Sequence, residues 1–402
     1  MIVTIGSGDN NGGERVNRRG YMLTQEEIQT IRETVPLLKE KGQTITAVFY
    51  KRLFEQHPEL KNVFNQTNQN KGLQSSALAM AVLAAAENIQ DLSPIVPAIM
   101  PVVYKHCALQ VKPEQYAVVG ENLIWAIEEV TGLKDEDPVI QTWVKAYGEI
   151  ADAFIGLERE VYNQMAWDGF RPFEVVDITE ETEEIKSFTI TSDDVDLSQF
   201  IPGQYITVDI DSEKLPYKAK RHYSIVDGNK DFLTFGVKRD VTDEHEGEVS
   251  TILHDDVAIG DTLYLSAPVG GFKLEHKANK QLFLGSGVGV TPLVSMYKEA
   301  VDVGLQATFI QSTANAKNIA FEEKIKAIAS QSSQAEVINH YRDQDAHIDG
   351  EQLKQYIDDD TEIYICGGDT FLKSIIKELR TLGVSMDNVH FETFIPRLSF
   401  SA

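Results

Sequence analysis

The chain has 402 residues, more than one compact hydrophobic core usually organises, so its length predicts two or three domains. Hydrophobic residues make up 42% and charged residues 25%, both ordinary for a soluble globular protein. The formal net charge of −25 would repel phosphate backbones and anionic lipid headgroups, which argues against nucleic acid as a partner.

Cysteine usage and hydropathy predict the compartment. Only Cys107 and Cys366 are present, which argues against a disulfide framework and predicts a reducing, cytoplasmic location. No apolar run approaches the roughly 20 residues that cross a bilayer, so stable membrane insertion is not expected. Residues 1–21 lack periodicity and the long apolar core of a secretory signal. They are therefore predicted to be a disordered extension.

The first structured part is predicted to be helical. Thr24 and Glu27 form the capping-box pattern that opens a helix just after Met22. From there to Tyr162 apolar residues recur at a spacing of three to four, and strand-like alternation is nearly absent. Helix ends or starts are predicted at Pro58, Pro94, Pro113 and Pro138. Residues 22–162 are therefore predicted to form an all-α domain.

The pattern then changes twice. Short β-rich runs follow in KSFTIT, GQYITVDI, RHYSIV, FLTFGVKR and DTLYLSAP, and their regular spacing predicts an antiparallel β-barrel over residues 168–275. In residues 278–402 the runs QLFLG, ATFIQS, AEVINHY and EIYICGG are each followed by a helical pattern. Alternating strands and helices predict a doubly wound α/β domain with a parallel sheet.

A glycine cluster lies between the first strand and helix of this last region. Gly285, Gly287 and Gly289 allow the backbone to approach a phosphate, and the following helix start offers free N–H groups. The segment is not a strict dinucleotide fingerprint, because Thr291 and Pro292 follow where a further glycine is expected. A purely structural turn is the alternative for this segment taken alone.

Four segments in this order resemble the ferredoxin-reductase family: RHYSI, GEVSTILHD, GSGVGVTP and ICGGDTFLKSIIKEL. The resemblance implies FAD on the barrel and NADH or NADPH on the α/β domain; the alternative is a barrel with buried tyrosines. It assigns FAD to Tyr205, Arg221, His222, Tyr223, Ser224, Gly247, Val249 and Ser250. It assigns the nicotinamide nucleotide to Gly287, Val288, Gly289, Val290, Thr291, Pro292, Cys366, Gly367 and Gly368. Gly368 stands where that family usually has proline.

A flavin accepts a two-electron hydride and releases electrons singly, so a one-electron metal centre is expected in the same chain. The helical domain resembles a globin from about Met22 to Tyr162. The resemblance implies haem b, with His106 as the proximal iron ligand, Phe64 as the phenylalanine that wedges the haem and Leu78 on the distal side. Taken alone, a histidine on a helix more often binds nothing.

The resemblance also assigns residues around the iron. Tyr116, ten residues after His106, and Glu158 on the last helix form the implied proximal relay, in which an anionic carboxylate increases electron donation by the imidazole. Tyr50 and Gln74 are assigned to the distal side, where both can donate hydrogen bonds to a bound ligand. Core packing is the alternative for Tyr50. Ala77, Leu78 and Met80 are expected to make the distal pocket apolar, and whether a lipid or an azole occupies it stays open.

A globin joined to such a reductase resembles the flavohaemoglobin family, the nitric oxide dioxygenases of bacteria and fungi. The segments YKHCALQVKPEQYAVVGENL, RHYSI, GSGVGVTP and HFETFIP carry the resemblance. It implies electron flow from NAD(P)H through FAD to haem and conversion of nitric oxide and O2 into nitrate, with no obligatory protein partner. Lys105 and Glu392 resemble residues at the flavin–haem junction. The segment implied to cover the flavin is Thr393, Phe394, Ile395 and Pro396.

Two other functions stay open at this point. One is a general NAD(P)H-dependent reductase of ferric iron, quinones or free flavin, and the other is a globin that stores oxygen or senses nitric oxide. The choice between NADH and NADPH also stays open. The strand end QSTANAKN has neither an arginine for a 2′-phosphate nor a clear acid for the ribose.

Overall fold

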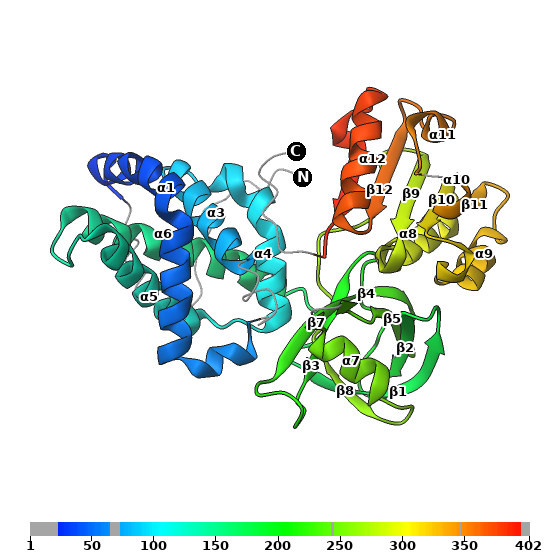
Figure 1. Cartoon of the computed structure of the whole chain (residues 1–402), viewed down its shortest axis with the longest axis horizontal. Coiled ribbons are helices and arrows are strands. Elements are labelled where there is room, and N and C mark those ends of the chain that lie inside the picture. Colours follow the sequence, from blue (N-terminus) through cyan, green and yellow to red (C-terminus); the bar gives the residue numbers. More distant parts are fainter. Residues whose placement is uncertain (1–22, 65–72, 243–244, 346, 395–402) are drawn as a thin grey trace, which may run out of the picture.

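The computed structural model describes residues 23–64, 73–242, 245–345 and 347–394. Figure 1 shows a group of helices on one side and a barrel with an α/β domain above it on the other side. The predicted extension 1–21 lies outside the described residues. Within the described ranges, no helix is both long and apolar enough to cross a membrane.

The helical part begins as predicted. The Thr24 hydroxyl accepts the Glu27 N–H, and the Glu27 carboxylate accepts the Thr24 N–H, so the capping box is formed. Apolar residues at helical spacing then bury Ile31, Phe49 and Leu53 on one face of the first helix. The helices are α1 (Gln25–Gln56), the 3-10 turn η1 (Pro58–Asn62), α3 (Leu73–Glu87), η2 (Ser93–Ile95), α4 (Val96–Leu109), α5 (Pro113–Thr131) and α6 (Pro138–Tyr162).

The second part is a closed antiparallel barrel with strand order β1-β2-β5-β4-β3-β8, which confirms the predicted fold class. Its interior is filled by alternating apolar side chains such as Phe173, Phe188 and Phe235, and Leu253 of helix α7 (Glu248–Asp255) packs against the same cluster. The strands are β1 (Arg171–Glu180), β2 (Ile185–Thr191), β3 (Tyr205–Ile210), β4 (Ala219–Gly228), β5 (Phe232–Lys238) and β8 (Thr262–Leu265); β6 (Val241–Thr242) and β7 (His245–Glu246) form a short separate pair.

The third part is a parallel five-stranded sheet with order β11-β10-β9-β12-β13, and it is doubly wound as predicted. Phe283 faces a core that includes α8, whereas its neighbours Leu282 and Leu284 face a core that includes α12. The strands are β9 (Lys280–Ser286), β10 (Gln306–Thr313), β11 (Ala335–Tyr341), β12 (Thr361–Cys366) and β13 (Val389–Glu392). The helices are η3 (Gly287–Gly289), α8 (Val290–Asp302), η4 (Ala316–Asn318), α9 (Glu322–Ala329), α10 (Arg342–Asp345), α11 (Gly350–Lys354), α12 (Asp369–Thr381) and η5 (Met386–Asn388).

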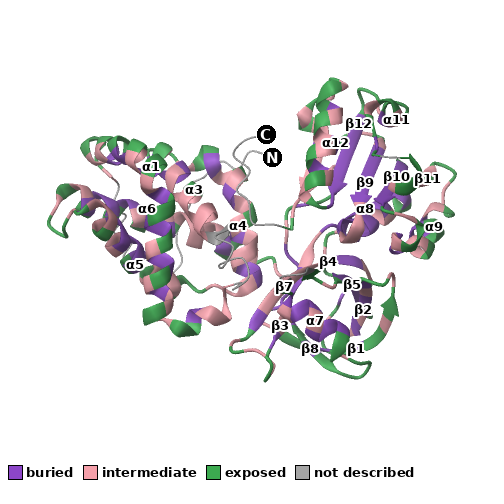
Figure 2. Cartoon of the chain, viewed as in Figure 1, coloured by how far each residue is buried: buried purple, intermediate pink, exposed green. Residues whose placement is uncertain are grey.

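The barrel and the α/β domain have a hydrophobic core in common, whereas the helical part has cores of its own. Ile185 and Val226 of the barrel belong to the same buried cluster as α8 and α9, so the barrel and the α/β domain share a core. The described residues of the helical part pack in clusters of their own. Figure 2 shows the buried strands of the two sheets and the separate buried faces of the helices. The limits 22–162, 168–275 and 278–402 remain our proposal for the domains.

Candidate functional site

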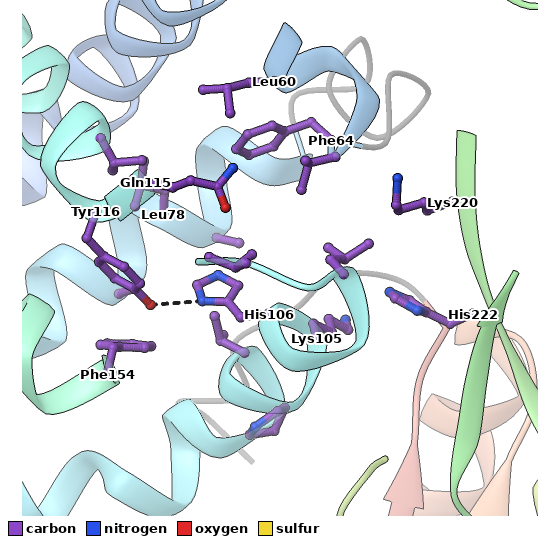
Figure 3. Close-up of a pocket in the computed structure, with 18 of the residues that line it drawn as sticks. Leu60, Phe64, Leu78, Lys105, His106, Gln115, Tyr116, Phe154, Lys220 and His222 are labelled. Atoms are coloured by element: carbon purple, nitrogen blue, oxygen red, sulfur yellow. Dashed lines mark hydrogen bonds between the residues drawn. The ribbon is translucent and has the colours of Figure 1, made fainter. Parts of the chain in front are cut away.

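A cavity of about 440 Å3 lies where the helical part meets the barrel. On the helical side its wall is mainly apolar and includes Phe49, Val63 and Leu123 together with His106. On the barrel side its wall is polar and comes from β3, β4 and the end of β13. Figure 3 shows His106 and Lys105 between these two sides, with Lys220 and His222 on the barrel.

His106 lies near the end of α4, and its imidazole is held by residues from two other helices. Its Nδ1 is 2.7 Å from Oε1 of Glu158 on α6 and 3.0 Å from the hydroxyl oxygen of Tyr116 on α5. The Tyr116 hydroxyl donates to the same Glu158 oxygen at 2.5 Å, so its oxygen can only accept at Nδ1. Nδ1 therefore carries the hydrogen. In the neutral imidazole this tautomer leaves the other ring nitrogen, Nε2, with the lone pair that can bind a metal ion.

Buried contacts fix this arrangement. Glu158 is only 2% exposed, and the backbone carbonyl of Tyr116 accepts a hydrogen bond from the Tyr147 hydroxyl at 2.6 Å. Burial, followed by the negative charge of Glu158, raises the pKa of Tyr116 far above its usual value, so its hydroxyl stays protonated. The Tyr162 hydroxyl donates to the carbonyl of Val111 at 2.8 Å, which ties the end of α4 to α6.

The opposite wall of the helical side contains Tyr50, Phe64 and Leu78. The ring of Tyr50 is buried on α1, with its centroid 5.7 Å from that of Phe64, and burial raises the pKa of its hydroxyl. A hydroxyl that stays protonated can donate to a ligand in the cavity. Ala77 also lines the wall, but Met80 does not. Its side chain is 40% exposed because it lies on the outer face of α3, which corrects the expectation for Met80. The side chain of Gln74 lies outside the described residues.

The barrel side of the cavity is built by neighbouring strands. Tyr205 on β3 and Arg221, His222 and Ser224 on β4 line it. The Arg221 guanidinium donates to the carbonyl of Lys220 at 2.9 Å and lies 3.6 Å from a Glu248 oxygen. The remaining guanidinium donors are available for an anion.

Four of the predicted flavin residues do not line this cavity. The Tyr223 ring stacks on Phe235, and Val249 is buried in the barrel core. Gly247 caps the start of α7. The Ser250 hydroxyl donates to the Gly247 carbonyl and accepts the Asp240 N–H, both at 3.1 Å. Its hydroxyl therefore already has partners within the chain.

Three titratable groups meet where the two sides face each other. Burial lowers the pKa of His222 to about 3, and its Nδ1 lies 2.8 Å from the Thr207 hydroxyl, so the imidazole is neutral. Burial raises the pKa of Glu392 to about 7, while the charge of Lys105 opposes that rise. Burial lowers the pKa of Lys105 in turn. Thr393 and Phe394 line this region, whereas Ile395 and Pro396 lie outside the described residues.

A second cavity of about 510 Å3 lies at the carboxyl ends of β9, β10 and β12, where doubly wound sheets bind ligands. Gly287 has a φ of +58°, and a Cβ on Gly289 would stand 2.5 Å from the backbone of Cys366. Glycine is therefore required for the turn and for the close approach of η3 to β12. Val288, Gly367 and Gly368 also line this cavity, while Val290, Thr291, Pro292 and Cys366 are buried behind its wall.

The structure adds one residue that sequence reasoning missed. Arg342 follows β11, and its Nη1 lies 3.4 Å from the Ser312 hydroxyl at the end of β10. Because β10 and β11 are adjacent and parallel, their carboxyl ends deliver Thr313 and Arg342 to the same cavity. The available signal was an arginine directly after the predicted strand AEVINHY.

Together the fold and the site define a globin joined in one chain to a β-barrel and an α/β domain of an oxidoreductase. Residues 47–154 match the family model described as Globin, and residues 283–377 match the model described as Oxidoreductase NAD-binding domain. A flavohemoprotein of Oceanobacillus iheyensis is 40% identical over 394 residues, covering 93% of this chain and 97% of that protein. One of Bacillus subtilis is 38% identical over 402 residues, covering 94% and 99%. The chain belongs to the flavohaemoprotein family.

Two solved structures are similar in architecture. The flavohemoglobin of Malassezia yamatoensis, with bound FAD and haem, has a TM-score of 0.83 at 22% identity and covers 92% of this chain and 99% of its own. The FAD/NAD-binding domain of a nitric oxide dioxygenase from Vibrio cholerae has a TM-score of 0.51 at 28% identity, covering 57% of this chain and 100% of its own. The first supports the complete fold and the second its reductase half.

Proposed function

We propose that the protein is an NAD(P)H-dependent nitric oxide dioxygenase that converts nitric oxide and O2 into nitrate. The observation that carries this proposal is the single cavity that extends from the His106 imidazole to β4 of the barrel. The proposed iron ligand and the proposed flavin-binding strand thus line one continuous cavity. The activity named for the similar Vibrio cholerae protein supports the same assignment.

The residues present fit the implied cofactors. Haem b fits the helical side, where the unprotonated Nε2 of His106 can bind iron inside an apolar wall with Phe64 and Leu78. FAD fits the barrel side, where Arg221 offers guanidinium donors. A nicotinamide nucleotide fits the second cavity, where a Cβ on Gly287 or Gly368 would stand in open space and not against other atoms of the chain. When bound, flavin accepts a hydride and releases single electrons, and haem iron accepts electrons singly.

The side chains around His106 have two tasks in this reaction. The Glu158 carboxylate accepts the Nδ1–H, which fixes the ring orientation and would make the imidazole a better electron donor to a bound haem iron. Tyr50 supplies a hydroxyl that stays protonated and would donate a hydrogen bond to a small ligand on this side of the cavity. The surrounding apolar side chains exclude water. In the balanced reaction, one NAD(P)H, two nitric oxide and two O2 give two nitrate ions, NAD(P)+ and one proton.

Arg221→Ala is expected to weaken FAD binding while haem stays bound. A charge-assisted hydrogen bond contributes about 1.5–3 kcal/mol, so we expect roughly 10- to 100-fold weaker binding of FAD. Equilibrium dialysis with free FAD measures this loss, and Arg239→Ala is the control because that guanidinium pairs with Asp255 on the barrel surface. Equal loss of haem and FAD from Arg221→Ala would contradict separate binding compartments.

Arg342→Ala is expected to weaken binding of NADPH more than binding of NADH. The carboxylates of this cavity are engaged with lysines, Glu184 with Lys238 at 3.0 Å and Asp369 with Lys373 at 2.7 Å. Arg342 is therefore the cation suited to a 2′-phosphate. Calorimetry should show roughly tenfold weaker binding of 2′,5′-ADP and little change for 5′-ADP. The exposed Arg380 on α12 provides the control substitution, and equal effects on both ligands would exclude this role.

The absorption spectrum of the purified full-length protein tests the cofactor assignment. We expect haem and flavin in roughly equal amounts and loss of nitric oxide that depends on both NAD(P)H and O2. Flavin without haem would favour a general NAD(P)H-dependent reductase. Haem without NAD(P)H oxidation would favour a gas-binding globin. We further propose a cytoplasmic location, in line with the free thiols of Cys107 and Cys366, and no obligatory protein partner.

A further inference from the structure

The two joints between the three parts of the molecule differ in kind. The barrel and the α/β domain share a hydrophobic core, and Asp227 of β4 pairs with Lys298 of α8 at 3.1 Å and Lys324 of α9 at 2.7 Å. Between the globin helices and the barrel, the described residues form no shared buried cluster. A polar joint of this type permits relative motion unless specific contacts prevent it.

Asn62, the last residue of η1, makes polar contacts between the globin helices and the barrel. Its side-chain oxygen accepts the backbone N–H of Lys218 at 2.9 Å, and its backbone carbonyl accepts the ammonium of Lys220 at 2.9 Å. Beside it, the Lys61 ammonium donates to the Tyr217 hydroxyl at 3.2 Å. The segment before β4 is thus bound to the end of η1. We call the contacts of Asn62 with Lys218 and Lys220 the Asn62 latch.

Lys220 is the charged member of the latch, and its side chain is only 9% exposed. Its ammonium lies 3.1 Å from an Asp209 oxygen on β3, as an ion pair rather than a well-directed hydrogen bond. The ring of Phe170 lies 5.3 Å away on another side. A cation with so little access to water loses a strong, charge-assisted bond if the globin carbonyl moves away. The ammonium therefore opposes separation of the two parts.

Both ends of the Asn62 latch lie close in sequence to residues that line the proposed cofactor compartments. Asn62 precedes Phe64, on the wall around His106, by two residues, and Lys220 directly precedes Arg221 on β4. Figure 3 draws Phe64 on the globin side of the cavity and Lys220 on the barrel side. A further contact at this joint is the ring of Tyr104 against Gly271, where a Cβ would come within 2.9 Å of the ring. The Tyr104 ring therefore limits how closely the globin helices can approach the barrel, whereas the Asn62 latch limits how far the two can separate.

We propose that Lys220 is a positioning residue that sets the spacing between the flavin and haem compartments through the carbonyl of Asn62. This inference rests on the proposed function, because it concerns electrons that pass from one compartment to the other. One hydride from NAD(P)H brings two electrons to the reductase half. With haem bound on the globin side, each electron would cross the joint singly and convert one ferric iron to ferrous. Because the rate of electron tunnelling falls steeply with distance, a looser joint slows this crossing and leaves hydride transfer unchanged.

The test uses the full-length protein loaded with both cofactors. Lys220→Met removes the ammonium and keeps the length of the side chain. Lys218→Met is the matched control, since the exposed Lys218 ammonium pairs with Asp211 at 3.1 Å and its backbone N–H to Asn62 is retained. Lys220→Arg restores a cation at the same position. Anaerobic stopped-flow absorbance measures flavin reduction by NAD(P)H and haem reduction separately.

We expect flavin reduction at the wild-type rate in all three variants and haem reduction about tenfold slower or more in Lys220→Met alone. Hydrogen–deuterium exchange should increase in residues 58–64 and 216–222 of Lys220→Met, and not in Lys218→Met. This readout does not depend on turnover. Lys220→Arg should recover most of the haem reduction rate and of the protection.

Wild-type haem reduction in Lys220→Met with both cofactors bound would overturn the proposal. Loss of haem or FAD from that variant would also overturn it, because Lys220 would then act in cofactor binding or folding. The proposed function fails separately. If the wild-type protein passed electrons to haem through an intact latch but formed no nitrate, Lys220 would keep its role and the reaction would be a different one.

Discussion

His106→Ala is expected to give a folded protein that keeps FAD and has lost most of its haem. The Nε2 of His106 is the nitrogen that the hydrogen bonds leave free for iron, and the surrounding wall offers mainly apolar contacts. Loss of an outer partner of a metal ligand already costs about 10- to 100-fold in affinity, so loss of the ligand should cost more. The reductase half should still oxidise NAD(P)H with an artificial electron acceptor.

Haem and flavin contents of the purified variant measure this outcome. His57→Ala is the matched control, because His57 lies on the same domain at the end of α1, outside the cavity wall. Full haem content with wild-type nitric oxide turnover in His106→Ala would remove His106 from the site. Loss of FAD together with haem would mean that the substitution disrupts the whole fold.

Glu158→Gln is expected to keep haem bound and to slow nitric oxide turnover by roughly tenfold or more. Glutamine keeps the size of the side chain and a hydrogen-bonding oxygen, but it removes the charge that faces His106 Nδ1 at 2.7 Å. The imidazole then donates less electron density to iron. Tyr116→Phe should act in the same direction but more weakly, because the hydroxyl orients Glu158 at 2.5 Å and carries no charge.

The rate of nitric oxide loss at saturating NAD(P)H measures this effect, with haem content determined in the same samples. Glu160→Gln provides the control, since Glu160 lies two residues further along α6 and is exposed. A wild-type rate in Glu158→Gln would leave His106 as a plain ligand without an assisting carboxylate. A wild-type rate in Tyr116→Phe together with a slow rate in Glu158→Gln would show that the charge of Glu158, and not the Tyr116 hydroxyl, supports turnover.

The architecture follows from patterns that are local in the sequence. Helical spacing, the capping box at Thr24 and the alternation of strands with helices each depend on neighbouring residues, and the three folds agree with them. Strands β1 and β13 were not predicted as separate strands. In β1 few side chains other than Phe173 and Val175 are buried, and β13 has only four residues, so neither shows a clear apolar pattern.

The contacts that build the site join residues that are far apart in the sequence, so local patterns do not predict them. The resemblance named His106, Tyr116 and Glu158, but it could not give the order of hydrogen bonds that places a hydrogen on Nδ1 of His106. Arg342 reaches the second cavity only through the parallel pairing of β10 with β11, which no local pattern in the sequence indicates. The contact of Lys220 with Asn62 spans 158 positions and involves a backbone carbonyl, which has no side-chain pattern in the sequence. Such contacts require the fold before they can be inferred.

The nitrate formed by the purified protein from nitric oxide and isotopically labelled dioxygen tests the central claim most directly. The proposal predicts that nitric oxide disappears only with NAD(P)H and O2 present, and that two nitrate ions form for each NAD(P)H oxidised. It also predicts that each nitrate carries both oxygen atoms of one labelled O2. Oxidation of NAD(P)H without nitrate, or nitrate without label from O2, would contradict it.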